Sequence, residues 1–192
     1  MIPKVEFKRS WIYDHNLRAL HRKGFKFPES KIIEVQTTKL EKLWSKEGSS
    51  ILKEMARVLK LKWYQKTTTC YITAGIPGFS DPLTIGYNKD VTKMFDTLTH
   101  EMIHRLWSEE ENWKVISKNW FSLQKKHKRL SITTRSHFTL MAVHAHLFKK
   151  FYNDKRLLKE MEAFTYPDYI KAWAIVKKEG YQNIIYELTK GR

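Results

Sequence analysis

The chain has 192 residues, of which 42% are hydrophobic, so it can bury the core of a single domain. Its 36 Lys and Arg residues against 20 Asp and Glu residues give a formal net charge of +16, which would attract nucleic acid or another anionic partner. The basic residues are spread along the whole chain, and this distribution favours a solvated surface, with at most weak electrostatic binding of nucleic acid.

The composition also bears on location. The single cysteine, Cys70, excludes an intrachain disulfide and suits a reducing compartment. The apolar runs fall short of the roughly 20 residues that a membrane-spanning helix needs, and the N-terminal residues lack the apolar stretch of a secretory signal. We therefore expect a protein of the cytoplasm that does not bind membranes.

Residues 1–65 are expected to form a helical N-terminal lobe. Apolar residues recur at helical spacing from Ile32 to Leu59, on both sides of Gly48. Pro28 and the residues after it are typical of a helix start, which places the first turn near residue 29.

Residues 66–152 are expected to form a catalytic core that begins with a small sheet. TTTCYITAG (67–75) and LTIGY (83–87) are rich in β-branched and aromatic residues, and the prolines and glycine of IPGFSDP (76–82) indicate a loop between them. A helix then begins near Val91. It should end near Trp107, because the acidic residues 109–111 are unfavourable at the carboxyl end of a helix.

The rest of the chain is expected to be helical. A basic, aromatic helix covers residues 112–130, and Thr133 or Thr134 caps the helix that follows. Residues 153–192 form C-terminal helices, the last two of which begin at Pro167 and are divided by Gly180. The pattern predicts one α+β domain, predominantly helical, with a small antiparallel sheet packed on the helix that contains residue 100.

That helix carries the sequence His100-Glu101-Met102-Ile103-His104, which has the form HExxH. Residues four apart lie on the same face of a helix, so His100 and His104 can bind one metal ion, with Glu101 beside the open coordination position. Zinc held by three protein ligands lowers the pKa of its water to about 7, and Glu101 could then act as general base.

The third ligand is predicted from the later histidines. His137 and His144 are seven residues apart on one helix, about 10 Å along its axis, so one ion cannot bind both. We favour His137, which lies near the polar start of the helix, and keep His144 as the alternative because its neighbours are apolar. His127 lies among positive charges that oppose a dication, and His146 is expected to point into solvent.

These residues resemble the zincin metallopeptidases, in which HExxH on a helix supplies two zinc ligands and the catalytic glutamate. The resemblance covers residues 67–152 and is closest to a small gluzincin-like or SprT-like type. The metzincin pattern fails, because Trp107 and Glu110 replace its glycine and last histidine. The resemblance implies a sheet on the active-site helix, whose edge strand, YITAG or LTIGY, binds extended substrate by strand addition.

The sequence therefore predicts a zinc-dependent metalloendopeptidase. His100, His104 and His137 would hold Zn²⁺, and Glu101 would act as general base on a zinc-bound water, with a protein or peptide as substrate. The alternative is a basic nucleic-acid-associated protein whose zinc site is structural or vestigial. A peptidase directed to chromatin or ribosomal substrates would join the charge to the chemistry.

Overall fold

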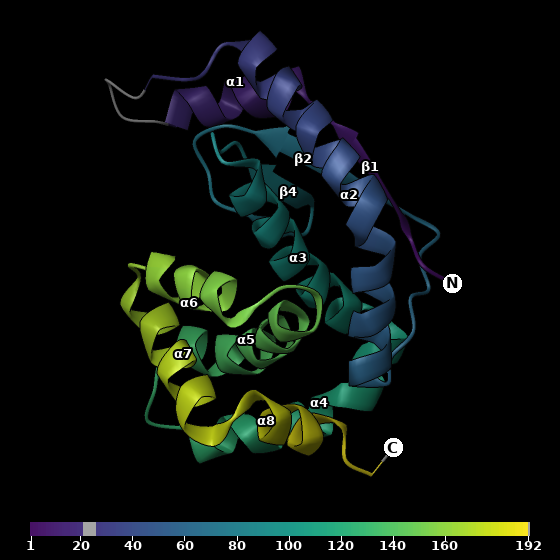
Figure 1. The fold of residues 1–192 in the computed structure, drawn as a ribbon, viewed down its shortest axis with the longest axis vertical. Coiled ribbons are helices and arrows are strands. Elements are labelled where there is room, and N and C mark those ends of the chain that lie inside the picture. The colour runs from purple at the N-terminus through teal and green to yellow at the C-terminus, as the bar shows by residue number, and fades with distance from the viewer. Residues whose placement is uncertain (21–25, 192) are drawn as a thin grey trace. The chain divides into compact units, whose positions relative to one another are not determined.

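The computed structural model describes residues 1–20 and 26–191. It is mostly helical, with one small sheet, and Figure 1 labels its elements. The strands are β1 (Lys4–Lys8), β2 (Thr67–Thr73), β3 (Phe79–Ser80) and β4 (Leu83–Gly86). The helices are α1 (Trp11–Leu20), α2 (Ser30–Leu59), α3 (Val91–Ser108), α4 (Glu110–Lys126), α5 (Ile132–Phe151), α6 (Asp154–Ala163), α7 (Pro167–Glu179) and α8 (Tyr181–Thr189).

The chain divides into two compact units. The first contains Met1–Leu52 and Trp63–Arg105, and the second contains Lys53–Lys62 and Leu106–Arg192. Helices α2 and α3 each continue from the first unit into the second along the chain.

The first unit contains a mixed four-stranded sheet with the order β1-β2-β4-β3 (Figure 1). β1 and β4 both run parallel to β2, and only β3 is antiparallel to its neighbour. The expectation of an antiparallel sheet was therefore wrong. The chain passes through α1 and α2 between β1 and β2, and a long helical crossover of this kind brings strands together in parallel.

The N-terminal region was expected to be mainly helical, and no strand was predicted in it, but it begins with β1. This strand pairs with β2 from Lys4 opposite Thr67 to Lys8 opposite Tyr71. Helix α1 is then tied to the sheet through Asp14, which is buried, accepts a hydrogen bond from Thr73 Oγ1 at 2.7 Å and forms an ion pair with Arg9.

Helix α2 begins at Ser30, as the sequence predicted, and passes through Gly48 without a break. A Cβ atom at position 48 would lie 2.5 Å from Trp44 Cε2, so glycine lets the indole ring lie flat across the helix. Trp44 also packs on Phe95 of α3, with ring centroids 5.3 Å apart. These contacts hold α2 against α3 within the first unit.

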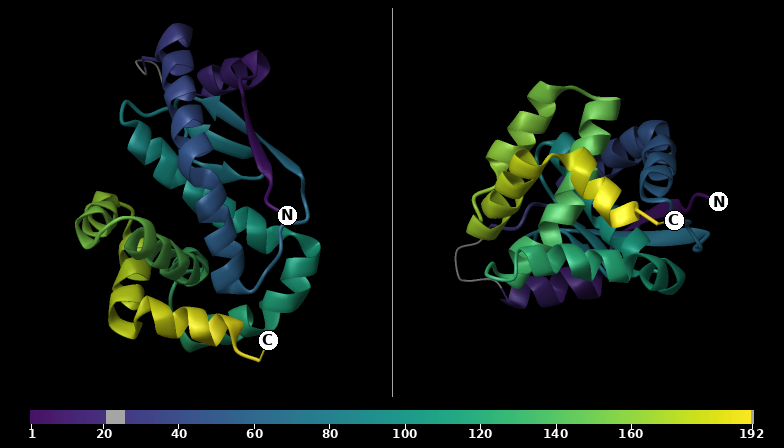
Figure 2. Two further views of the ribbon diagram at one scale, coloured as in Figure 1. Left: turned by 45° about the vertical axis from the view of Figure 1, so that its right-hand side comes forward. Right: turned by 90° about the horizontal axis from the view of Figure 1, so that it is seen from below.

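The second unit is built around α5, which contacts α4, α6, α7 and α8 (Figure 1, Figure 2). The residues from Phe138 to Ala145 are all buried. Ser131, which precedes Thr133 and Thr134, caps α5, because its hydroxyl accepts a hydrogen bond from Thr134 N at 3.1 Å. The predicted start of α7 at Pro167 and its end at Gly180 are confirmed.

A buried carboxylate joins the end of α2 to α5 within this unit. The Glu54 side chain is 5% exposed, and it contacts Arg57, His146 and Lys150. The Arg57 guanidinium, followed by the lysine and histidine, holds the pKa of Glu54 well below its usual range. The expectation that His146 points into solvent was wrong, because its Nε2 lies 2.7 Å from Glu54 Oε1.

None of the described helices combines the length and the apolar content needed to cross a bilayer.

Candidate metal centre

Helix α3 presents the HExxH residues on adjacent positions of its surface. The rings of His100 and His104, one helical turn apart, have centroids 5.3 Å apart, and both side chains are partly buried. The opposite side of the helix is apolar, with Leu98, Met102 and Ile103 fully buried. The helix therefore packs through its apolar face and leaves the two imidazoles on a face that a metal ion can reach.

Glu101 is the most buried polar residue of the motif, with 8% of its surface exposed. This burial disfavours the charged carboxylate and raises the pKa of Glu101 to about 7. A carboxyl group with this pKa can both accept and donate a proton near neutral pH.

The segment before β3 lies directly against Glu101. A Cβ atom at Gly78 would lie 2.7 Å from Glu101 Oε1 and 2.6 Å from Thr97 Cγ2, so only glycine permits this approach. Arg105, one residue after His104, donates a hydrogen bond from Nη1 to Ser80 O at 2.9 Å. Residues 78–80 are thus held beside Glu101.

The sheet order changes which strand can receive an extended substrate. YITAG includes the end of β2 and LTIGY includes β4, and both strands lie inside the sheet. Neither is an edge strand, so both candidates from the sequence were wrong. The edge strands are β1 and β3, and it is β3 that adjoins Glu101 through Gly78.

His137 has a ring orientation suited to metal binding. Its Nδ1 lies 2.8 Å from Thr133 O, and because a carbonyl oxygen can only accept, Nδ1 carries the proton. The lone pair is then on Nε2, the atom through which this tautomer would bind an ion. Histidine ligands of metals commonly donate their other ring N–H to a carbonyl in this way, which sets the tautomer.

The histidines of α3 and α5 have the chemistry of zinc ligands. His100 and His104 lie in the first compact unit, and His137 lies in the second. Neutral imidazole nitrogens are common zinc ligands, and three of them leave a fourth position for water. His137 is therefore a candidate third ligand by its chemistry.

His144 lies in the core, where the sequence placed it. It is 1% exposed and meets the ring of Phe148 edge-on, with centroids 4.7 Å apart. Burial, with the nearby charge of Arg156, lowers the pKa of His144 to about 3. The imidazole is therefore neutral in the folded chain over the physiological range.

This burial predicts a loss of stability in acid. Between pH 6.5 and about 3 the unfolded chain protonates His144 and the folded chain does not, so the free energy of unfolding should fall as the pH drops. The shift corresponds to roughly 3–5 kcal/mol. Urea unfolding at a series of pH values would measure it, and His144→Leu should make the slope shallower between pH 6.5 and 4.5, above the range in which Glu54 contributes. An equal slope in the variant would contradict the assignment.

The other partly buried histidine of this region, His127, was expected to be excluded by positive charge. It lies against Phe138, and its Nε2 is 2.9 Å from Glu179 Oε1. Cys70 is fully buried in β2, and burial raises the pKa of its thiol. His127 thus packs against Phe138 and Glu179, and Cys70 packs inside the sheet, so neither residue is a candidate metal ligand.

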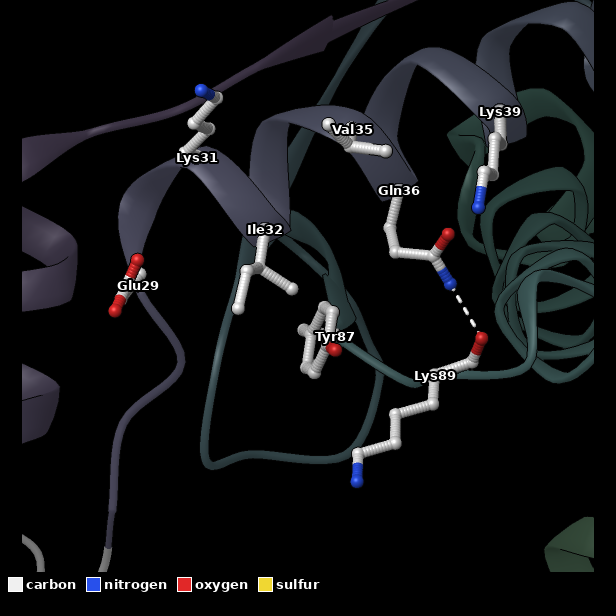
Figure 3. A pocket seen from close by; sticks show the side chains of 8 residues that line it. All are labelled: Glu29, Lys31, Ile32, Val35, Gln36, Lys39, Tyr87 and Lys89. Carbon is white, nitrogen blue, oxygen red and sulfur yellow. Dashed lines mark hydrogen bonds between the residues drawn. The ribbon is translucent and has the colours of Figure 1, made fainter.

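A separate cavity of about 430 Å³ lies beside the first turns of α2 (Figure 3). Ile32 and Tyr87 face each other across it, and Gln36 Nε2 donates a hydrogen bond to Lys89 O at 2.6 Å. Its lining includes no histidine and no residue of HExxH. The cavity is therefore distinct from the candidate metal centre.

Comparison of the chain with protein-family models, curated proteins and solved structures finds no match. Function is therefore inferred from the residues themselves.

Proposed function

We propose that this protein is a zinc-dependent metallopeptidase. The observation that carries the proposal is the placement of HExxH on α3, with two imidazoles on one face and a buried glutamate between them, next to an edge strand. The His137 tautomer supports His137 as the third zinc ligand.

Zinc would supply a Lewis acid that lowers the pKa of a water ligand to about 7. Glu101 accepts the proton of the attacking water and delivers it to the leaving amine. Residues 78–80 of the β3 edge bind the substrate backbone in extended form, and Arg105 keeps this segment in place. Gly78 lets the segment that precedes β3 lie directly against Glu101.

Cleavage of an unfolded protein tests this function. The zinc-loaded chain should cleave it, a chelator should stop the reaction, and added zinc should restore it. Circular dichroism must show that the chelated chain remains folded. A folded, zinc-loaded chain without cleavage, or cleavage that resists chelation, would refute the proposal.

The second candidate, a structural zinc site in a nucleic-acid-associated protein, is consistent with the net charge of +16. A structural site would have four protein ligands and no water. The proposed ligands are His100, His104 and His137, and a set of three leaves the fourth position to water, which favours the catalytic site.

A further inference from the structure

The exposed side of α4 combines aromatic rings with lysines. Trp113, Trp120 and Phe121 form a mutually packed cluster, with ring centroids 5.1 to 5.8 Å apart and edge-to-face geometry. Phe121 is the outermost of the three and is 52% exposed. The two tryptophans beneath it fix the ring, so little side-chain entropy is lost when a ligand stacks on it.

Lysines lie beside this ring on the same face of the helix. At 100° per residue, Lys118 and Lys125 fall within about 60° of Phe121 around the helix axis. Both lysines are exposed, and neither forms an ion pair with an acidic residue in the described part of the chain. The turn after α4 adds two more exposed cations without an ion pair in the described chain, Lys128 and Arg129.

The acidic residues of this region do not neutralise these cations. Glu110 and Glu111, in the first turn of α4, are both occupied by Lys114. Glu187 is paired with Lys126 and Lys190. The stretch from Lys118 to Arg129 therefore presents uncompensated positive charge next to an exposed aromatic face.

We propose that the surface formed by Lys118, Phe121 and Lys125 of α4, with Lys128 and Arg129 of the turn after it, binds single-stranded nucleic acid. Phosphates interact with the cations, and a base stacks on the Phe121 ring, a combination typical of sequence-independent binding to single strands. A duplex would offer only its phosphates, since its bases are already stacked. This binding requires neither zinc nor peptide hydrolysis.

An anionic membrane is the less suitable partner. A helix that lies in a lipid interface needs a wide apolar face. Among the large apolar residues of α4, only Val115 and Phe121 are strongly exposed. They are six residues apart, which places them about 120° from each other around the helix, so they form no common surface for insertion.

The test uses the full chain and a fluorescein-labelled oligothymidylate of about 20 nucleotides, with binding measured by anisotropy at several salt concentrations. The double variant K118E/K125E should weaken binding by at least about tenfold and reduce its salt dependence. The charge-matched control K31E/K39E, on exposed positions of α2, should change affinity by less than about threefold.

Phe121→Ala separates stacking from charge. It should weaken binding by about tenfold with an unchanged salt slope, because a stacked base contributes about 1–3 kcal/mol. Equal losses in the two double variants would overturn the proposal, as would full affinity in Phe121→Ala. Binding to anionic phospholipid vesicles without binding to the oligonucleotide would assign the face to a membrane instead.

Discussion

Glu101→Gln is expected to abolish peptide hydrolysis while zinc stays bound. Glutamine has nearly the shape of glutamate, so it fits the space beside Gly78, but it cannot accept a proton from the attacking water. General acid–base catalysis contributes typically about 10²–10⁴-fold, so kcat should fall by roughly a thousandfold. Hydrolysis of the unfolded protein substrate, with zinc measured on the same sample, provides both readouts.

The matched control for this variant is Glu111→Gln. Glu111 is exposed on α4 and pairs with Lys114 at the surface, so its replacement should leave kcat unchanged. If Glu101→Gln kept more than about a tenth of the activity while Glu111→Gln behaved as wild type, Glu101 would not be the general base.

His137→Ala should lower the affinity for zinc by at least about a hundredfold, because a site with only two imidazoles holds the ion weakly. His144→Leu should keep zinc, because this side chain lies in the apolar core beside Phe148. Titration of metal-free protein with zinc against a competing chelator would measure both variants. Circular dichroism would separate loss of zinc from loss of fold.

The opposite result for the two histidine variants would identify a different third ligand. If His144→Leu lost zinc and His137→Ala retained it, with both variants folded, His144 would be the third ligand. His137 would then act only through its hydrogen bond to Thr133 and its contact with Tyr169.

The long helices could be predicted from the sequence because their apolar periodicity extends over many turns. This holds for α2 and for α3, which carries HExxH. Pro167 and Gly180, which mark the start and the end of α7, act only on the backbone next to them. The strands β2 and β4 are also marked by local composition. Features of this kind depend only on neighbours in the chain.

The missed features depend on partners far along the chain. β1 has only five residues and becomes a strand by pairing with residues 67–71, a partner that its own composition does not reveal. The direction of the sheet follows from the crossover through α2, and the edge position of β3 follows from the strand order. Likewise, His146 contacts Glu54, which lies 92 residues earlier in the chain.

The candidate site likewise has one part that depends on local sequence and one part that depends on distant residues. The spacing of His100, Glu101 and His104 is a property of one helix, so the sequence alone could place these residues together. The preference for His137 over His144 as the proposed third ligand rests on the burial of His144 and on the carbonyl of Thr133, which sets the His137 tautomer. The predicted cap of α5, Thr133 or Thr134, was wrong, because Ser131 caps this helix.

X-ray absorption at the zinc edge, on the purified full chain, tests the central claim most directly. A catalytic site predicts about one zinc per chain, with three imidazole nitrogens at about 2.0–2.1 Å and one oxygen from water. The metal content and the ligand count should both change in His137→Ala, and neither should change in His144→Leu. A folded chain without zinc, or an ion closed by four protein ligands, would contradict the catalytic site.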